Sequence, residues 1–129
     1  MNRATAAADI INVFLTLRNQ VKVYHWQTMS FSRHKATDDL VTSLDENIDK
    51  FVEVYMGKYG PPTFSGANMK ITVRNVIDKK AAELLKASVE WLTDHLPRFL
   101  NKRKDTDLLN IRDEILADLN QVLFLFRLK

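Results

Sequence analysis

The chain lacks cysteine and has little glycine or proline, with three of each among 129 residues. Without cysteine it has no disulfides, thiolate metal ligands or thiol catalysis, and it suits a reducing compartment. So few helix-breaking residues disfavour a fold of strands and tight turns. No apolar run approaches the length of a membrane span. The first nine residues also lack the basic-then-apolar order of a secretory signal. We therefore expect a cytoplasmic protein that is not associated with membranes.

The remaining composition fits one helical domain over residues 1–129. The chain is 46% hydrophobic and 27% charged, which suits a single buried core. Its net charge of +3 is unevenly distributed, because residues 36–56 hold six acids and one base. An acidic segment in an otherwise basic chain favours cation binding there, although a solvated helix face has the same composition.

Hydrophobic spacing predicts four helical segments. They cover residues 4–27, a stretch from Thr37 or Asp38 to the breakers at 57–62, residues 78–101 and residues 106–128. Pro97 must kink or restart the third segment, and Asp105 is the predicted N-cap of the fourth. We interpret residues 63–77 as a crossover with room for a short helix, because a single strand would have no partner. The predicted fold is an all-α four-helix bundle with one long crossover between its second and third helices.

Five side chains in the first two helices have the chemistry of metal ligands: His25, His34, Asp38, Asp49 and Glu53. The last four form two pairs spaced by four residues, and each such pair shares a helical face. Imidazole with carboxylate suits Fe(II), Mn(II) or Zn(II). The Glu-x-x-His pairs of di-iron bundles are missing, so a centre of that kind is not expected. Two structural alternatives remain open, a hydrogen-bonded core histidine and an acidic stripe that is solvated or paired with basic residues.

The spacing of these residues along the second helix predicts a site shared by two chains. Asp49 lies eleven residues beyond Asp38, which is about 16 Å along a helix. Metal–ligand bonds are about 2 Å long, so one ion cannot join Asp49 to the histidines of its own chain. A second copy, antiparallel about a two-fold axis, would bring its Asp49 and Glu53 to the first copy's histidines and create two equivalent sites.

Three short motifs resemble those of the Dps-like miniferritins. They are Tyr24-His25-Trp26, His34-x-x-x-Asp38 and Asp49-x-x-x-Glu53, and the segment from Asp105 to Phe126 is similar to the last helix of that family. The loop between the two histidines is shorter than is usual there. Val54 stands where those proteins carry arginine, and no lysine-rich tail is present.

The resemblance implies a ferritin-like bundle that binds and oxidises Fe(II), with peroxide or oxygen as oxidant, for iron storage or detoxification. The five candidate residues would be its ligands, with Trp26 beside them, and Zn or Mn would be substitutes for iron. It also implies a homo-oligomer built from two-fold dimers, which a larger cage could extend. DNA is not an expected partner at a net charge of +3. The alternative is a non-catalytic helical interaction module that retains the fold.

Overall fold

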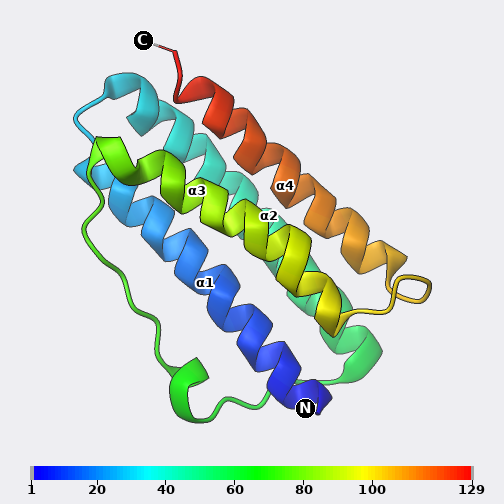
Figure 1. The fold of residues 1–129 in the computed structure, drawn as a ribbon. Coiled ribbons are helices and arrows are strands. Elements are labelled where there is room, and N and C mark those ends of the chain that lie inside the picture. Colours follow the sequence, from blue (N-terminus) through cyan, green and yellow to red (C-terminus); the bar gives the residue numbers. More distant parts are fainter. Residues whose placement is uncertain (1, 129) are drawn as a thin grey trace.

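Four α-helices and one long crossover make up the fold in a computed structural model that describes residues 2–128 (Figure 1). The helices are α1 (Arg3–Gln27), α2 (Phe31–Tyr59), α3 (Ala81–Glu90) and α4 (Thr106–Leu125). α1 and α2 form an antiparallel pair, and the crossover returns the chain to the end of the bundle where α1 stops (Figure 1). Within residues 2–128 there is no strand, so the expected all-helical fold with four helices is confirmed.

The second helix begins earlier than the sequence pattern predicted. Ser30 is its N-cap, and the hydroxyl of Ser30 accepts a hydrogen bond from the backbone N–H of Arg33. Thr37, predicted as a helix start, instead lies inside the helix, where its hydroxyl donates to the carbonyl of Arg33 at 2.7 Å. The prediction of a start at Thr37 or Asp38 was wrong because a serine cap satisfies the first turn seven residues upstream of Thr37. The helix ends at Tyr59, and its C-cap is Gly60, whose positive φ of 89° suits glycine.

The core contains the apolar positions that the helical spacing predicted. Phe14 lies at its centre, with ring contacts to Phe51 at 5.0 Å and to Trp91 at 5.8 Å, both edge-to-face. Trp91 therefore packs on the third helical segment, as expected. In α4 the buried positions follow the predicted stripe, whereas Phe124 is 52% exposed. Within the described chain no helix combines the length and the apolar character needed to cross a membrane.

The third helical segment changes its winding before Pro97. It runs through the 3₁₀ turn η2 (Asp78–Lys80), α3, the π-helical turn η3 (Trp91–His95) and the 3₁₀ turn η4 (Leu96–Phe99). Pro97 has no N–H to donate to the preceding turn, so a regular α-helix cannot continue through it. The predicted interruption at Pro97 is confirmed.

The crossover is fastened to α1 by side-chain amides. Gln20, which is buried, donates to the carbonyl of Arg74 at 2.7 Å and accepts from the Arg74 N–H at 2.9 Å. About two turns further along α1, the side-chain Oε1 of Gln27 accepts from the Val76 N–H at 3.0 Å. The side-chain amide of Asn12 donates to the backbone carbonyls of Asn68, within the 3₁₀ turn η1 (Gly66–Met69), and of Lys70, which follows it. The extended part of the crossover is therefore held without a partner strand.

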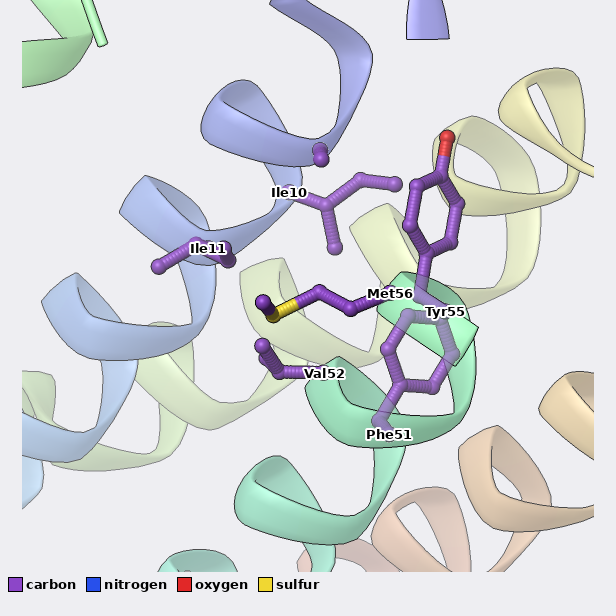
Figure 2. Close-up of a pocket in the computed structure, with 7 residues that line it drawn as sticks. Ile10, Ile11, Phe51, Val52, Tyr55 and Met56 are labelled. Atoms are coloured by element: carbon purple, nitrogen blue, oxygen red, sulfur yellow. The ribbon is translucent and has the colours of Figure 1, made fainter. Parts of the chain in front are cut away.

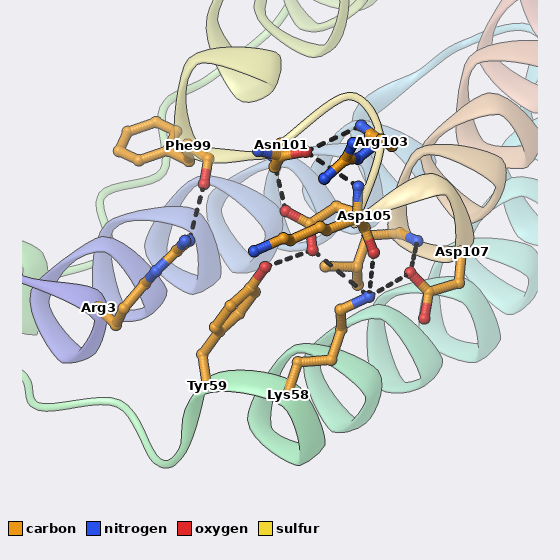
Figure 3. Close-up of polar contacts among 10 residues, drawn as sticks. Arg3, Lys58, Tyr59, Phe99, Asn101, Arg103, Asp105 and Asp107 are labelled. Atoms are coloured by element: carbon orange, nitrogen blue, oxygen red, sulfur yellow. Dashed lines mark hydrogen bonds and ion pairs between the residues drawn. The ribbon is translucent and has the colours of Figure 1, made fainter.

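Asp105 stands at the start of α4 but does not cap it with its side chain. Its carboxylate is fully buried and accepts from the Asn101 N–H at 2.7 Å and from the Tyr59 hydroxyl at 2.5 Å (Figure 3). The Lys58 ammonium lies 3.4 Å from the same carboxylate. Asp105 is the N-cap residue of α4, as predicted, but its side chain makes no capping hydrogen bond, because these three donors from α2 and the preceding loop occupy the carboxylate.

Candidate metal site

The structure brings His25 and His34 together where α1 ends and α2 begins. Their rings stack, with centroids 3.9 Å apart and an angle of 17° between the planes. His25 is only 6% exposed and follows the buried face of α1, as its spacing from Val21 predicted. His34 is half-buried. A turn of three residues between antiparallel helices places the two side chains at the same level of the bundle.

Each histidine is oriented by the backbone of the other. The Nδ1 atom of His25 lies 2.8 Å from the carbonyl oxygen of His34, and the Nδ1 atom of His34 lies 2.9 Å from the carbonyl oxygen of His25. A carbonyl oxygen only accepts, so both Nδ1 atoms carry a proton and donate it. In the neutral rings, Nε2 then keeps its lone pair. Metal-binding histidines commonly have this arrangement, with one ring nitrogen fixed by a hydrogen bond and the other free.

Asp38 is the third predicted ligand near this pair. One of its carboxylate oxygens lies 4.0 Å from Nε2 of His25, and the side chain is exposed to solvent. Because α2 already begins at Phe31, His34 and Asp38 lie one turn apart on the same face. Within residues 2–128 no three side chains of metal-binding type converge closely enough to hold an ion by themselves. The chain provides two oriented imidazoles and a nearby carboxylate.

Asp49 and Glu53 lie further toward the C-terminal end of α2, on the solvent-exposed face that also carries Asp38. We call this face the outer face of α2. Both side chains are exposed. The pKa of Glu53 is raised because its protonated form donates a hydrogen bond to the Asp49 carboxylate and because the negative charge of Asp49 disfavours ionisation. Two carboxyl groups one helical turn apart repel each other when both are ionised, and a cation would relieve this repulsion. At about 1.5 Å per residue they lie roughly 16 Å along the helix from Asp38, so one chain does not bring the five predicted residues together.

Two further residues of this surface have identifiable contacts. Asp45, which lies between the two groups of candidate ligands, forms an ion pair with Arg18 at 2.9 Å. Trp26 is exposed rather than buried in the core, and the ammonium of Lys22 lies 5.2 Å from its ring centroid. Trp26 therefore follows His25 in sequence but points to the surface of the single chain.

The residues that hold the histidine turn in place were not predicted from the sequence. Asp78, at the start of the third helical segment, accepts from the hydroxyls of Tyr24 and Thr28, both at 2.6 Å. These hydrogen bonds lower the pKa of Asp78. Arg33 donates to the Tyr24 hydroxyl and to the backbone carbonyls of Asp78 and Phe126. The one signal in the sequence was an acid at a predicted helix start, which does not reveal a contact across 50 residues.

The fold and this surface define an all-helical protein with paired histidines at one end and an acidic outer helix. The chain belongs to a family of unknown function, DUF5856, which matches residues 25–126 and so includes all five candidate ligands. It is similar to an uncharacterized 14.6 kDa protein in the mobD-ri intergenic region of Enterobacteria phage T4, with 36% identity over 81 residues. That match covers 60% of this chain and 63% of the phage protein. No solved structure matches the chain.

Proposed function

We propose that the protein binds Fe(II) at a histidine–carboxylate site shared between two copies, and oxidises it in the manner of a miniferritin. One observation carries the proposal, namely the stacked pair of His25 and His34 with each Nδ1 donating to the other residue's carbonyl. This arrangement leaves the Nε2 lone pair of each ring for metal binding, with the Asp38 carboxylate 4.0 Å from Nε2 of His25. Four helices joined by a long crossover between the second and the third also support a ferritin-like bundle.

The donor set fits iron chemistry. Imidazole nitrogen and carboxylate oxygen together suit Fe(II), and the carboxylates favour the more highly charged Fe(III) product. Each Fe(II) gives up one electron. One hydrogen peroxide molecule takes two electrons from two Fe(II) ions and, with two protons, becomes two waters. Mn(II) and Zn(II) prefer similar ligands and would bind as substitutes without this oxidation step.

The second copy completes the site. Asp49 and Glu53 of one chain would join the histidines and Asp38 of its two-fold mate, which gives two equivalent sites in a dimer. The test is complementation between two inactive variants, His25→Ala/His34→Ala and Asp49→Ala/Glu53→Ala. After refolding together, mixed dimers have one intact site and one that lacks all four residues, so Fe(II) binding should partly return. If confirmed heterodimers bind no more iron than the separate variants, the shared site is wrong.

Oxidation is measured separately from binding. Aerobic addition of Fe(II), with and without peroxide, should produce ferric absorbance faster with the wild-type protein than with the His25→Ala/His34→Ala variant. A protein that binds Fe(II) but leaves its rate of oxidation unchanged would be an iron carrier, and the enzymatic part of the proposal would fail.

A non-catalytic interaction module is the second candidate, favoured by the exposed Trp26 and Met29 beside the turn between α1 and α2. Large apolar side chains gathered at the surface are typical of contacts with another protein. Metal content after purification without chelators distinguishes the two candidates. A metal-free protein whose melting temperature does not respond to Fe(II), Mn(II) or Zn(II) would favour the module.

A further inference from the structure

The candidate ligands on α2 are spaced symmetrically about a point between residues 43 and 44. His34 and Glu53 are equally far from that point, and so are Asp38 and Asp49. The large hydrophobic side chains exposed on α2 are Phe31, at 77%, and Met56, at 38%. These two residues are also equally far from the same point. A surface that meets itself across a two-fold axis requires this kind of pairing, in which residue i of one copy lies opposite residue j of the other.

Met56 borders a shallow apolar recess between α1 and α2. The recess is lined by Ala7, Ile10, Ile11, Phe51, Val52, Tyr55 and Met56. Figure 2 shows the Met56 side chain reaching from α2 toward Ile11 of α1, with Val52 below it. The recess therefore opens beside the outer face of α2, at the end opposite Phe31.

We infer that a second copy of this chain seats its Phe31 on this recess, against Met56, with the two α2 helices antiparallel. The register rests on the proposed function, because it is the one that places His34 opposite Glu53. The apolar pair supports the same register without reference to metal, since an exposed aromatic ring and an apolar recess become neighbours at each end of the interface. Covering both rings from water favours association by the hydrophobic effect.

The negative charge of the outer face of α2 opposes this association when no cations are bound. Each copy brings Asp38, Asp45, Asp49 and Glu53 to the interface, and Arg18 neutralises Asp45 within its own chain. The remaining carboxylates of the two copies repel each other at neutral pH unless cations lie between them. The interface thus couples the apolar contacts at its two ends to the metal sites between them, and metal should strengthen dimerisation.

Disulfide cross-linking tests the register in a chain that has no cysteine of its own. The variant Phe31→Cys/Met56→Cys separates its two thiols by 25 residues, about 37 Å along α2, so they cannot join within one chain. Across the antiparallel interface they become neighbours. In a glutathione redox buffer with Mn(II), the double variant should form covalent dimers at least tenfold faster than either single variant. The single variants are matched controls, because the antiparallel register keeps two copies of one position far apart. Equal rates for single and double variants would overturn the inference.

A second measurement uses Phe31→Ser, with Phe124→Ser on α4 as a control that removes another exposed ring. In sedimentation with Mn(II), Phe31→Ser should raise the dimer dissociation constant at least tenfold, and the control should leave it unchanged. If complementation restores iron binding but neither Phe31 variant differs from its control, the inference fails and the proposed function stands. If the double variant cross-links in the expected register but the protein binds no metal, the inference stands and the proposed function fails.

Discussion

The two ends of the bundle each bury an ionisable side chain, and they treat it differently. At one end, the carboxylate of Asp105 receives hydrogen bonds from Asn101 and Tyr59 and lies beside the Lys58 ammonium (Figure 3). At the other end, His25 has its Nδ1 atom fixed by the backbone, while Nε2 has only the Asp38 carboxylate at 4.0 Å. A buried group whose hydrogen bonds are complete supports the fold. A buried imidazole whose second ring nitrogen has a lone pair without a hydrogen bond is a candidate metal ligand.

The largest effect on stability is expected at the Asp105 end of the bundle. Asp105→Ala would leave the Tyr59 hydroxyl and the Asn101 N–H without their acceptor and would remove one of the two carboxylates that pair with the Lys58 ammonium. The free energy of unfolding should fall by about 3 kcal/mol, as is typical when one partner of a buried network is removed. Urea denaturation measures the loss. The control is Asp107→Asn, which changes a more exposed partner of Lys58 and should cost no more than about 0.5 kcal/mol.

Acid titration sharpens the same contrast. Burial alone would raise the pKa of Asp105, but hydrogen bonds from Asn101 and Tyr59 and the Lys58 ammonium hold it below its usual value. A depressed pKa means that the stabilisation is present above the unfolded-state value of about 3.9 and is lost as the pH falls through the folded-state pKa. Unfolding midpoints measured between pH 7 and 3 should therefore fall less steeply for Asp105→Asn than for the wild type. Parallel curves would show that this carboxylate contributes nothing to acid sensitivity.

An intermediate effect is expected at the support of the histidine turn. Asp78→Ala would remove the acceptor of the Tyr24 and Thr28 hydroxyls and should cost about 1–2 kcal/mol. The affinity for Mn(II) should fall together with stability, because the turn between the two histidines loses its anchor. Lys79→Ala, an exposed neighbour, is the control and should change neither quantity. Unchanged Mn(II) affinity in a destabilised Asp78→Ala protein would show that the turn positions itself without this contact.

At the end of the bundle that holds His25 and His34, substitutions should change metal affinity more than stability. His34→Ala and Asp38→Ala remove partly or largely exposed side chains and should alter the unfolding free energy of the metal-free protein by less than about 1 kcal/mol. Each should weaken Mn(II) binding at least tenfold, measured by equilibrium dialysis. A loss of several kcal/mol in the metal-free protein would place these residues with Asp105, as parts of a structural network.

The smallest effect is expected on the outer face of α2. Glu53→Gln and Asp49→Asn each remove one charge from a repelling pair, so the metal-free protein should unfold at a slightly higher temperature. Thermal melts in chelator measure the change, with Glu46→Gln as an exposed control on the same helix. A lower melting temperature would mean that these carboxylates already have favourable partners.

The sequence predicted the parts of this molecule that depend on local spacing. The helical periodicity located the core positions, and the four-residue spacing put His34 and Asp38 on one face. The early start of α2 was missed although its signal, Ser30, was local, because the acids at 38 and 39 offered a competing helix start. Contacts between distant segments could not be predicted, since nothing near Asp105 or Asp78 in sequence names Tyr59 or Tyr24 as a partner.

The hydrogen bonds between glutamine side chains of α1 and the crossover backbone have a consequence for hydrogen–deuterium exchange. The amide hydrogens of Arg74 and Val76 are bound to the side-chain oxygens of Gln20 and Gln27, although neither residue lies in a helix or strand. Two alternate amides in an extended segment should therefore exchange slowly, in the pattern that a strand edge produces. Exchange data alone would suggest a β-strand here, whereas the protecting groups are glutamine side chains of α1.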